Sequence, residues 1–255
     1  MELSHQEFFG FLEEKYNLYN NPAFIGPDPV SVPHQFALKE DIEIAAFLSA
    51  AISWGNRVSI VKDANRLVSM MDCSPFHFIT EASRSEFSSF SVFYHRTFNG
   101  LDCLFFLESL RNIYLHHDGL EACFSGEFHT GMKEKITGFR KIFIEPPHEK
   151  RTEKHLPDPM KGSSCKRINM FLRWMVRDDG KGVDFGLWKK ISPAELLCPL
   201  DIHSGNVARK LGILKRKQND WKAVEEMTSV LRSLDPADPV KYDFALFGLG
   251  IFEKF

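Results

Sequence analysis

Two short segments of the sequence hold residue types that can do covalent chemistry. Lys166 follows a turn of small residues that begins at Gly162, and it lies in the first turn of an expected helix with an apolar face. Asp201 comes directly after an apolar Pro-Leu pair and just ahead of another expected helix, and His203 follows two residues later. An amine can attack carbon, and a carboxylate can stabilise positive charge that develops during a reaction. A lysine near a helix start is also commonly a solvated surface group, and an aspartate there is commonly an N-cap.

The positions of Lys166 and Asp201 favour the charge states that such chemistry needs. The adjacent Arg167 and the positive end of the helix dipole both disfavour an ammonium group at Lys166. The same dipole effect at the second helix favours the ionised form of Asp201. The sequence therefore predicts a reactive amine and a carboxylate anion.

These segments resemble the helix-hairpin-helix (HhH-GPD) superfamily of DNA glycosylases, which carry a Gly-x-Gly-x-Lys turn and a downstream apolar-Asp-x-His segment. The resemblance implies that Lys166 is the Schiff-base lysine, Asp201 the catalytic aspartate and His203 a phosphate-facing histidine. The separation of 35 residues between the lysine and the aspartate resembles the archaeal 8-oxoguanine DNA glycosylase branch. The chain is also similar throughout to a bacterial family that has no assigned function.

The resemblance implies a base-excision repair glycosylase with AP-lyase activity on double-stranded DNA that carries a damaged base, an oxidised purine among the candidates. A base must leave the duplex stack before it is cut, so a side chain has to act as a wedge. Position suggests Trp54, Asn56 and Arg57 for that wedge. Further candidates for DNA contacts lie on or beside the lysine segment, namely Gly162, Ser164, Arg167 and Arg173.

The expected hairpin turn departs from the superfamily pattern at its second glycine, which is Ser164 in this chain. A serine tolerates a positive φ poorly, so we expect the backbone amides of the turn to be arranged differently. We also expect Ser163 or Ser164 to cap the Lys166 helix, because serine is a favoured N-cap residue.

Helical periodicity is the dominant pattern, and no clear alternation typical of strands is found, so the expected fold class is all-α. Helices are expected at residues 5–16, 40–52, 56–71, 101–116, 131–144, 164–177, 203–213, 220–233 and 239–251. Residues 145–162, rich in Pro, His and charge, are expected to form an exposed loop. The resemblance implies a single glycosylase-like domain, 1–255, in which two helical subdomains flank a cleft. These are residues 40–144 and 160–255, with residues 1–35 packing on the second.

Composition excludes several classes of protein. The chain has 255 residues, 44% of them hydrophobic and 26% charged, which is too apolar for disorder. No apolar run is long enough to cross a membrane, and the N-terminal segment is unlike a signal peptide, so we expect a cytoplasmic protein. The resemblance to DNA glycosylases implies that it is nucleoid-associated. The five cysteines show no CxxC spacing, so we expect no disulfide framework, no zinc site and no iron–sulfur cluster. The glycosylase resemblance implies no other metal site and no cofactor.

Charge is distributed unevenly along the chain. Residues 133–222 hold 21 Lys and Arg against 11 Asp and Glu, whereas residues 1–132 hold 8 against 17. A basic stretch in an otherwise acidic chain suggests a surface for a polyanion, although solvated helix faces would give the same counts. We expect DNA to lie along this stretch; the oligomeric state stays open at this point.

Two other functions are compatible with the sequence. A DNA-binding protein of the same fold without catalysis would keep the basic stretch and bind with a steep salt dependence. A helical metal-dependent phosphohydrolase of the HD type would use a histidine and a His-Asp pair, and His95 with the run His116-His117-Asp118 supplies such residues. That run also fits a helix C-terminus closed by Gly119.

Overall fold

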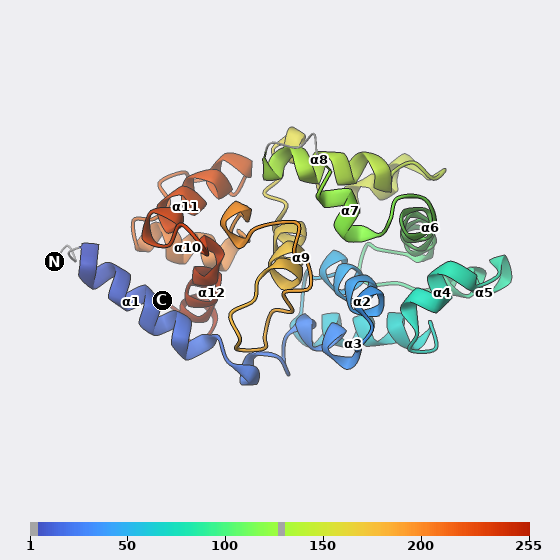
Figure 1. Cartoon of the computed structure of the whole chain (residues 1–255), viewed down its shortest axis with the longest axis horizontal. Helices are drawn as coiled ribbons and strands as arrows, with labels where there is room; N and C mark the ends of the chain where they lie inside the picture. Colours follow the sequence, from blue (N-terminus) through green and yellow to red (C-terminus); the bar gives the residue numbers. More distant parts are fainter. Residues whose placement is uncertain (1–4, 127–130) are drawn as a thin grey trace. The chain divides into compact units, whose positions relative to one another are not determined.

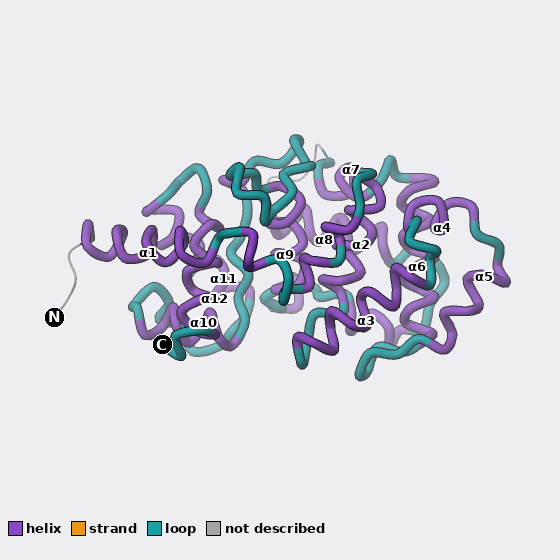
Figure 2. Tube along the Cα trace, turned by 90° about the horizontal axis from the view of Figure 1, so that it is seen from below, coloured by secondary structure: helices purple, strands orange, loops and turns teal. Residues whose placement is uncertain are grey.

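The protein is all-α, as the sequence predicts (Figure 1). The computed structural model describes residues 5–126 and 131–255, and within these ranges helices and connecting segments occur without any strand (Figure 2). No helix in the described ranges combines the length and the hydropathy that a membrane span requires.

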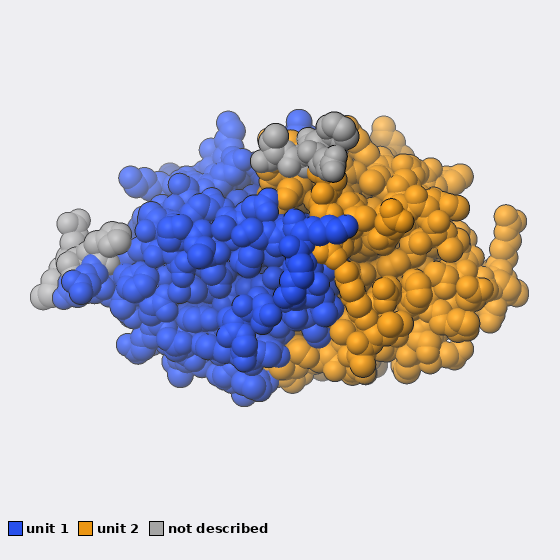
Figure 3. Space-filling model, viewed as in Figure 1, with its two compact units in different colours: residues 1–24, 159–255 blue, residues 25–158 orange. Residues whose placement is uncertain are grey.

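The chain forms two compact units (Figure 3). Unit 1 comprises residues 1–24 and 159–255, and unit 2 comprises residues 25–158. The subdomain expected at 40–144 thus lies within unit 2. Of the N-terminal segment expected at 1–35, residues 1–24 are assigned to unit 1, whereas residues 25–35 belong to unit 2.

Unit 2 is built around phenylalanines. Its helices are α2 (Lys39–Ala51), α3 (Arg57–Ser69), α4 (Pro75–Glu81), α5 (Arg84–Ser88), α6 (Gly100–His116), α7 (Leu120–Phe124) and α8 (Met132–Phe143). The ring centroid of Phe47 on α2 lies 6.1 Å from that of Phe106 on α6 and 5.3 Å from that of Phe143 on α8. Aromatic pairs at such separations contribute about 1 kcal/mol each beyond their area burial, so this cluster holds the three helices together.

Unit 1 carries the lysine and aspartate segments. Its helices are α1 (His5–Tyr19), α9 (Lys166–Val176), α10 (Ile202–Lys210), α11 (Trp221–Leu234) and α12 (Asp243–Ile251). Helix α12 packs against both α1 and α10. Short 3₁₀ helices occur in both units, at Pro22–Phe24, Pro29–Ser31, Pro33–Gln35, Ser89–Val92, Lys150–His155, Pro159–Lys161, Pro193–Glu195 and Pro239–Tyr242.

A buried arginine joins the elements of unit 1. Arg177, the residue after α9, is 1% exposed. Its guanidinium donates hydrogen bonds to Asp238 at 2.8 Å and to Asp184 at 3.0 Å. It also donates to the hydroxyl of Tyr16 on α1 at 2.9 Å. A buried charge is tolerated only when it is paired in this way, so Arg177 fixes α1 and the segment before α12 onto the end of α9.

Residues 145–162 differ from the exposed loop that their composition predicts. Thr152 and His155 are buried, and the segment contains two 3₁₀ helices. The hydroxyl of Thr152 and the guanidinium of Arg151 donate to the fully buried carboxylate of Asp102 on α6, at 2.8 Å and 2.9 Å. The polar residues of this segment therefore satisfy a buried acid, which composition alone does not reveal.

Candidate active site

The lysine of the candidate site stands at the very start of a helix. Helix α9 begins at Lys166, and the turn before it has left-handed backbone at Gly162 (φ 83°) and Cys165 (φ 49°). Ser164 does not have a positive φ, so the strain expected at the second glycine position falls on Cys165 instead. Cys165 is also the N-cap residue, which corrects the expectation that a serine caps this helix.

Side chains fix this turn and connect it to the aspartate segment. The amide of Asn169 donates to the carbonyl of Ser164 at 3.1 Å, from one turn inside α9. The hydroxyl of Ser163 accepts from the N–H of Cys165 at 3.2 Å. The hydroxyl of Ser164 donates to the carbonyl of Leu200 at 3.4 Å, and this residue directly precedes the aspartate. The turn and the start of α10 are therefore held against each other within unit 1.

The aspartate is the N-cap of α10. Asp201 Oδ1 accepts a hydrogen bond from the N–H of Ser204 at 2.9 Å, and Ser204 Oγ accepts one from the N–H of Asp201 at 3.0 Å. This reciprocal pair is a capping box, which satisfies two backbone donors at the helix start. The cap occupies Oδ1 and leaves the second carboxylate oxygen, Oδ2, available for another partner.

That second oxygen faces the lysine. Lys166 Nζ lies 4.0 Å from Asp201 Oδ2, and the two side chains are 27% and 30% exposed. Lys166 Nζ also lies 3.4 Å from the sulfur of Met170, one turn along α9. The fold thus brings an amine and a carboxylate from distant parts of the sequence into one half-buried pair that a ligand can reach. An amine beside a fixed anion can act as a nucleophile while the anion stabilises developing positive charge.

Asp243, at the start of α12, adds a third charge that the sequence pattern does not single out. The residue is 7% exposed, and its carboxylate pairs with Arg173 on α9. Burial raises the pKa of Asp243 to about 6, and the nearby negative charge of Asp201 acts in the same direction. The positive charges of Arg173 and Lys166 oppose this shift. In the sequence, Asp243 is an isolated acid at the start of an apolar stretch, which could have indicated a functional residue. The helix dipole explains an acid at that position equally well.

The other candidates on the lysine segment differ in how far ligands can reach them. Arg173 is 3% exposed and bonded to two carboxylates, so the expectation that it contacts DNA is corrected: it lies on the buried face of α9. Arg167 is half-buried, and burial lowers its pKa to about 10. Gly162 and His203 are exposed beside the turn and in the first turn of α10.

The three candidate wedge residues belong to unit 2, on the segment that leads into α3. The half-buried ring of Trp54 stacks on His155 at 5.5 Å between centroids and meets the ring of His95 edge-on at 5.3 Å. Asn56 caps α3, because its side chain accepts a hydrogen bond from an N–H of the first turn at 3.2 Å. Arg57 is the first residue of that helix. Trp54 therefore has a fixed aromatic backing, whereas Asn56 already has a structural role.

The histidines that suggested a metal site are engaged elsewhere. His95 Nδ1 lies 2.6 Å from Asp63 Oδ2, and His117 Nε2 lies 2.9 Å from Glu145 Oε2. Across residues 5–126 and 131–255, no three or more His, Cys, Asp or Glu side chains are grouped so that they could hold a metal ion. The described structure therefore does not gather His95 with the run at 116–118 into a ligand set.

The fold and the site define an all-helical protein of two units, with a lysine and an aspartate paired at the starts of two helices. The chain belongs to the family described as "Protein of unknown function (DUF2400)", whose model matches residues 28–252. That match includes Lys166, Asp201 and Asp243. No curated protein and no solved structure matches the chain.

Proposed function

We propose that the protein is a helix-hairpin-helix DNA glycosylase with AP-lyase activity, acting on double-stranded DNA that carries a damaged base. The observation that carries this proposal is the 4.0 Å separation between Lys166 Nζ and Asp201 Oδ2. A partly exposed lysine and aspartate can pair simply because their charges are opposite. What supports a shared role is that this pair joins the two segments whose order along the chain is that of the superfamily which they resemble.

In the proposed reaction the damaged nucleotide leaves the duplex stack and its sugar approaches Lys166. The amine attacks C1′ as the N-glycosidic bond breaks. The departing base takes the bonding electrons, together with a proton that the lysine nitrogen loses. The carboxylate of Asp201 stabilises the positive charge that develops on the sugar. As the ring opens, the C1′–O4′ bond breaks and O4′ takes a proton from water, which leaves a protonated imine between Lys166 and C1′. Water then accepts a proton from C2′, and the 3′ phosphate leaves with the electrons of its bond to C3′.

Other residues are given supporting roles in this proposal. Trp54, backed by two histidines, is the proposed wedge that occupies the space of the extruded base, with Arg57 beside it on α3. His203 and the backbone at Gly162 are the proposed phosphate contacts, since both are exposed close to the lysine and aspartate segments. Half-buried Arg167 adds positive charge next to the reacting amine.

The proposal is tested by borohydride, which reduces a protein–DNA imine to a stable amine. Wild-type protein is incubated with duplexes carrying 8-oxoguanine, uracil, thymine glycol or an abasic site. We expect a covalent adduct on at least one of them, and none with Lys166→Gln. Lys161→Gln removes an exposed lysine five residues upstream and should leave the adduct intact, which makes it a matched control.

A second variant separates the charge of the aspartate from its capping role. Asn caps helices about as well as Asp, so Asp201→Asn should keep the start of α10 and lose only the negative charge. We expect base release to slow by about 10²- to 10³-fold, the usual effect of losing one electrostatic stabiliser. An adduct that persists in Lys166→Gln would refute the role of Lys166 as the nucleophile. Absence of adduct and base release on every duplex, with salt-sensitive binding retained, would identify a non-catalytic DNA-binding protein.

A further inference from the structure

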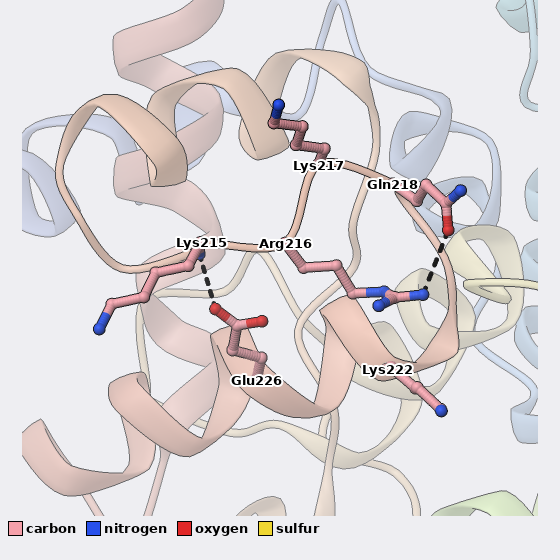
Figure 4. Close-up of a pocket in the computed structure, with 6 residues that line it drawn as sticks. All are labelled: Lys215, Arg216, Lys217, Gln218, Lys222 and Glu226. Atoms are coloured by element: carbon pink, nitrogen blue, oxygen red, sulfur yellow. Dashed lines mark hydrogen bonds between the residues drawn. The ribbon is translucent and has the colours of Figure 1, made fainter.

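The connection between α10 and α11 forms a basic hollow on the surface of unit 1 (Figure 4). Its volume is about 510 Å³, and its lining is Lys215, Arg216, Lys217, Gln218, Lys222 and Glu226. Small-molecule sites are lined mainly by apolar and aromatic side chains. This lining contains neither kind, so the hollow does not suit a nucleobase or another apolar group. Four cationic side chains against one carboxylate suit an anion.

Most of the negative charge near the hollow is already in use. The guanidinium of Arg216 binds Asp220, with Nε 2.6 Å from Oδ1. Glu226 Oε1 accepts a hydrogen bond from the backbone N–H of Lys215 at 2.6 Å and so holds the loop in place. The ammonium groups of Lys215, Lys217 and Lys222 form no salt bridge with any residue in the described ranges. Lys215 and Lys217 on the loop and Lys222 in the first turn of α11 thus present positive charge to an external partner.

The loop that carries Lys215 and Lys217 is anchored to the lysine–aspartate site. Asn219 donates a hydrogen bond to the backbone carbonyl of Asp201 at 3.0 Å. Arg209 holds Asn219 in turn, at 2.6 Å, and donates to the carbonyl of Arg216 at 2.8 Å. At the other end of the loop, the N–H that opens α11 donates to the carbonyl of Gly162 at 3.0 Å. The loop is therefore tied to both segments that form the candidate active site.

A glycine makes this anchoring possible. A Cβ at Gly205 on α10 would lie 2.9 Å from Asn219 Oδ1 and 3.0 Å from Arg209 Nη1. A Cβ at this position would force Asn219 Oδ1 to shift and would crowd Arg209 Nη1, so the absence of a side chain lets both anchoring groups lie close to α10. The sequence thus provides room for the link between the loop and the start of α10.

We infer that the hollow is a phosphate-binding surface for the DNA backbone, with Lys215, Lys217 and Lys222 as its contacts. The inference rests on the proposed function for the identity of the polyanion. Because the loop is fixed to both active-site segments, it would hold backbone phosphates of the same duplex whose damaged base reaches Lys166. Such contacts set the register of the duplex on the protein and carry no sequence information.

The test measures the salt dependence of binding to an undamaged labelled duplex. The triple variant Lys215→Gln, Lys217→Gln, Lys222→Gln is compared with wild type and with a charge-matched control. The control is Lys62→Gln, Arg84→Gln, Lys254→Gln, which removes three exposed cations outside the basic stretch. Each lost phosphate contact lowers the slope of log K against log salt by about 0.9, so the triple variant should lose about 2.7. Between roughly 50 and 200 mM salt, wild type would then lose about 40-fold more affinity than the triple variant.

The outcomes separate this inference from the proposed catalysis. A slope for the triple variant equal to that of the control would overturn the inference, while the Lys166-dependent adduct would still stand. A reduced slope without any adduct would support phosphate binding at the hollow and refute the proposed catalytic activity. Failure of wild-type protein to bind any duplex would overturn both. Circular dichroism of each variant checks that the fold is retained.

Discussion

The buried carboxylate of Asp243 should make the stability of unit 1 depend on pH in an unusual direction. Its pKa is about 6 in the folded protein because of burial, against 3.8 for the ordinary group. Between these values the folded state holds a proton that the unfolded chain has released. The contribution of Asp243 to the free energy of unfolding is therefore greatest below pH 3.8 and falls as the pH rises to 6. A shift of about 2 units corresponds to ~3 kcal/mol in all.

The variant Asp243→Asn removes this titration. Between pH 4 and pH 7, the contribution of Asp243 to the free energy of unfolding of wild type falls by about 2 kcal/mol. We expect the free energy of unfolding of the variant, relative to wild type, to rise by that amount over the same interval. At any one pH, the difference in free energy of unfolding between the variant and wild type also includes the loss of the ion pair with Arg173. Arg173 retains its hydrogen bond to Asp184 at 3.2 Å.

Urea unfolding followed by tryptophan fluorescence suits this measurement. Three of the four tryptophans, Trp174, Trp188 and Trp221, are buried in unit 1, so the signal reports mainly on the unit that contains Asp243. Asp178→Asn removes an exposed carboxylate of the same unit and controls for the loss of one acid. A difference between Asp243→Asn and wild type that is the same at pH 4 and pH 7 would refute the reasoning.

Three further substitutions test the packing that positions the site. Burial alone would raise the pKa of Asp179, but hydrogen bonds, chiefly the one from Tyr16, lower it to about 2. The contribution of Asp179 to the free energy of unfolding is therefore lost as the pH falls below 3.8. Urea unfolding of Asp179→Asn should show a destabilisation that is about 1 kcal/mol smaller at pH 3 than at pH 5. Gly205→Ala should give no rise in urea stability, although alanine is favoured in a helix by about 1 kcal/mol, because the new Cβ would displace Asn219. Gly100→Ala should lower thermal stability, since its Cβ would lie 1.9 Å from a backbone carbonyl oxygen, and overpacking of this kind costs about 1–3 kcal/mol.

The sequence could predict those features that depend on local pattern. The long helices follow from apolar periodicity, and α9 and α10 begin at or next to the expected chemical residues, Lys166 and Asp201. The short helices α4, α5 and α7, of five to seven residues, were not predicted because a window of that length holds too few turns to show a period.

Features that depend on long-range pairing could not be predicted. An arginine on a helix is ordinarily exposed, and Arg173 is buried only because Asp243, 70 residues later, and Asp184 supply buried carboxylates. The burial of segment 145–162 could not be predicted for the same reason, since its polar composition does not indicate that it binds the buried carboxylate of Asp102 on α6. In both cases the partner is fixed by tertiary packing, and neither residue carries a local signal of the other.

The two interpretations of Asp201 that the sequence offered, helix cap and reactive carboxylate, are compatible in the structure. One oxygen closes the capping box with Ser204, and the other faces Lys166 at 4.0 Å. The cap fixes the rotamer of the side chain, so the oxygen that faces the amine is already in position and no further side-chain conformational entropy is lost during a reaction. A carboxylate at a helix start is also stabilised as an anion by the helix dipole. The structural role of Asp201 therefore supports the proposed chemistry, because the same hydrogen bond that starts α10 aims the charge at Lys166.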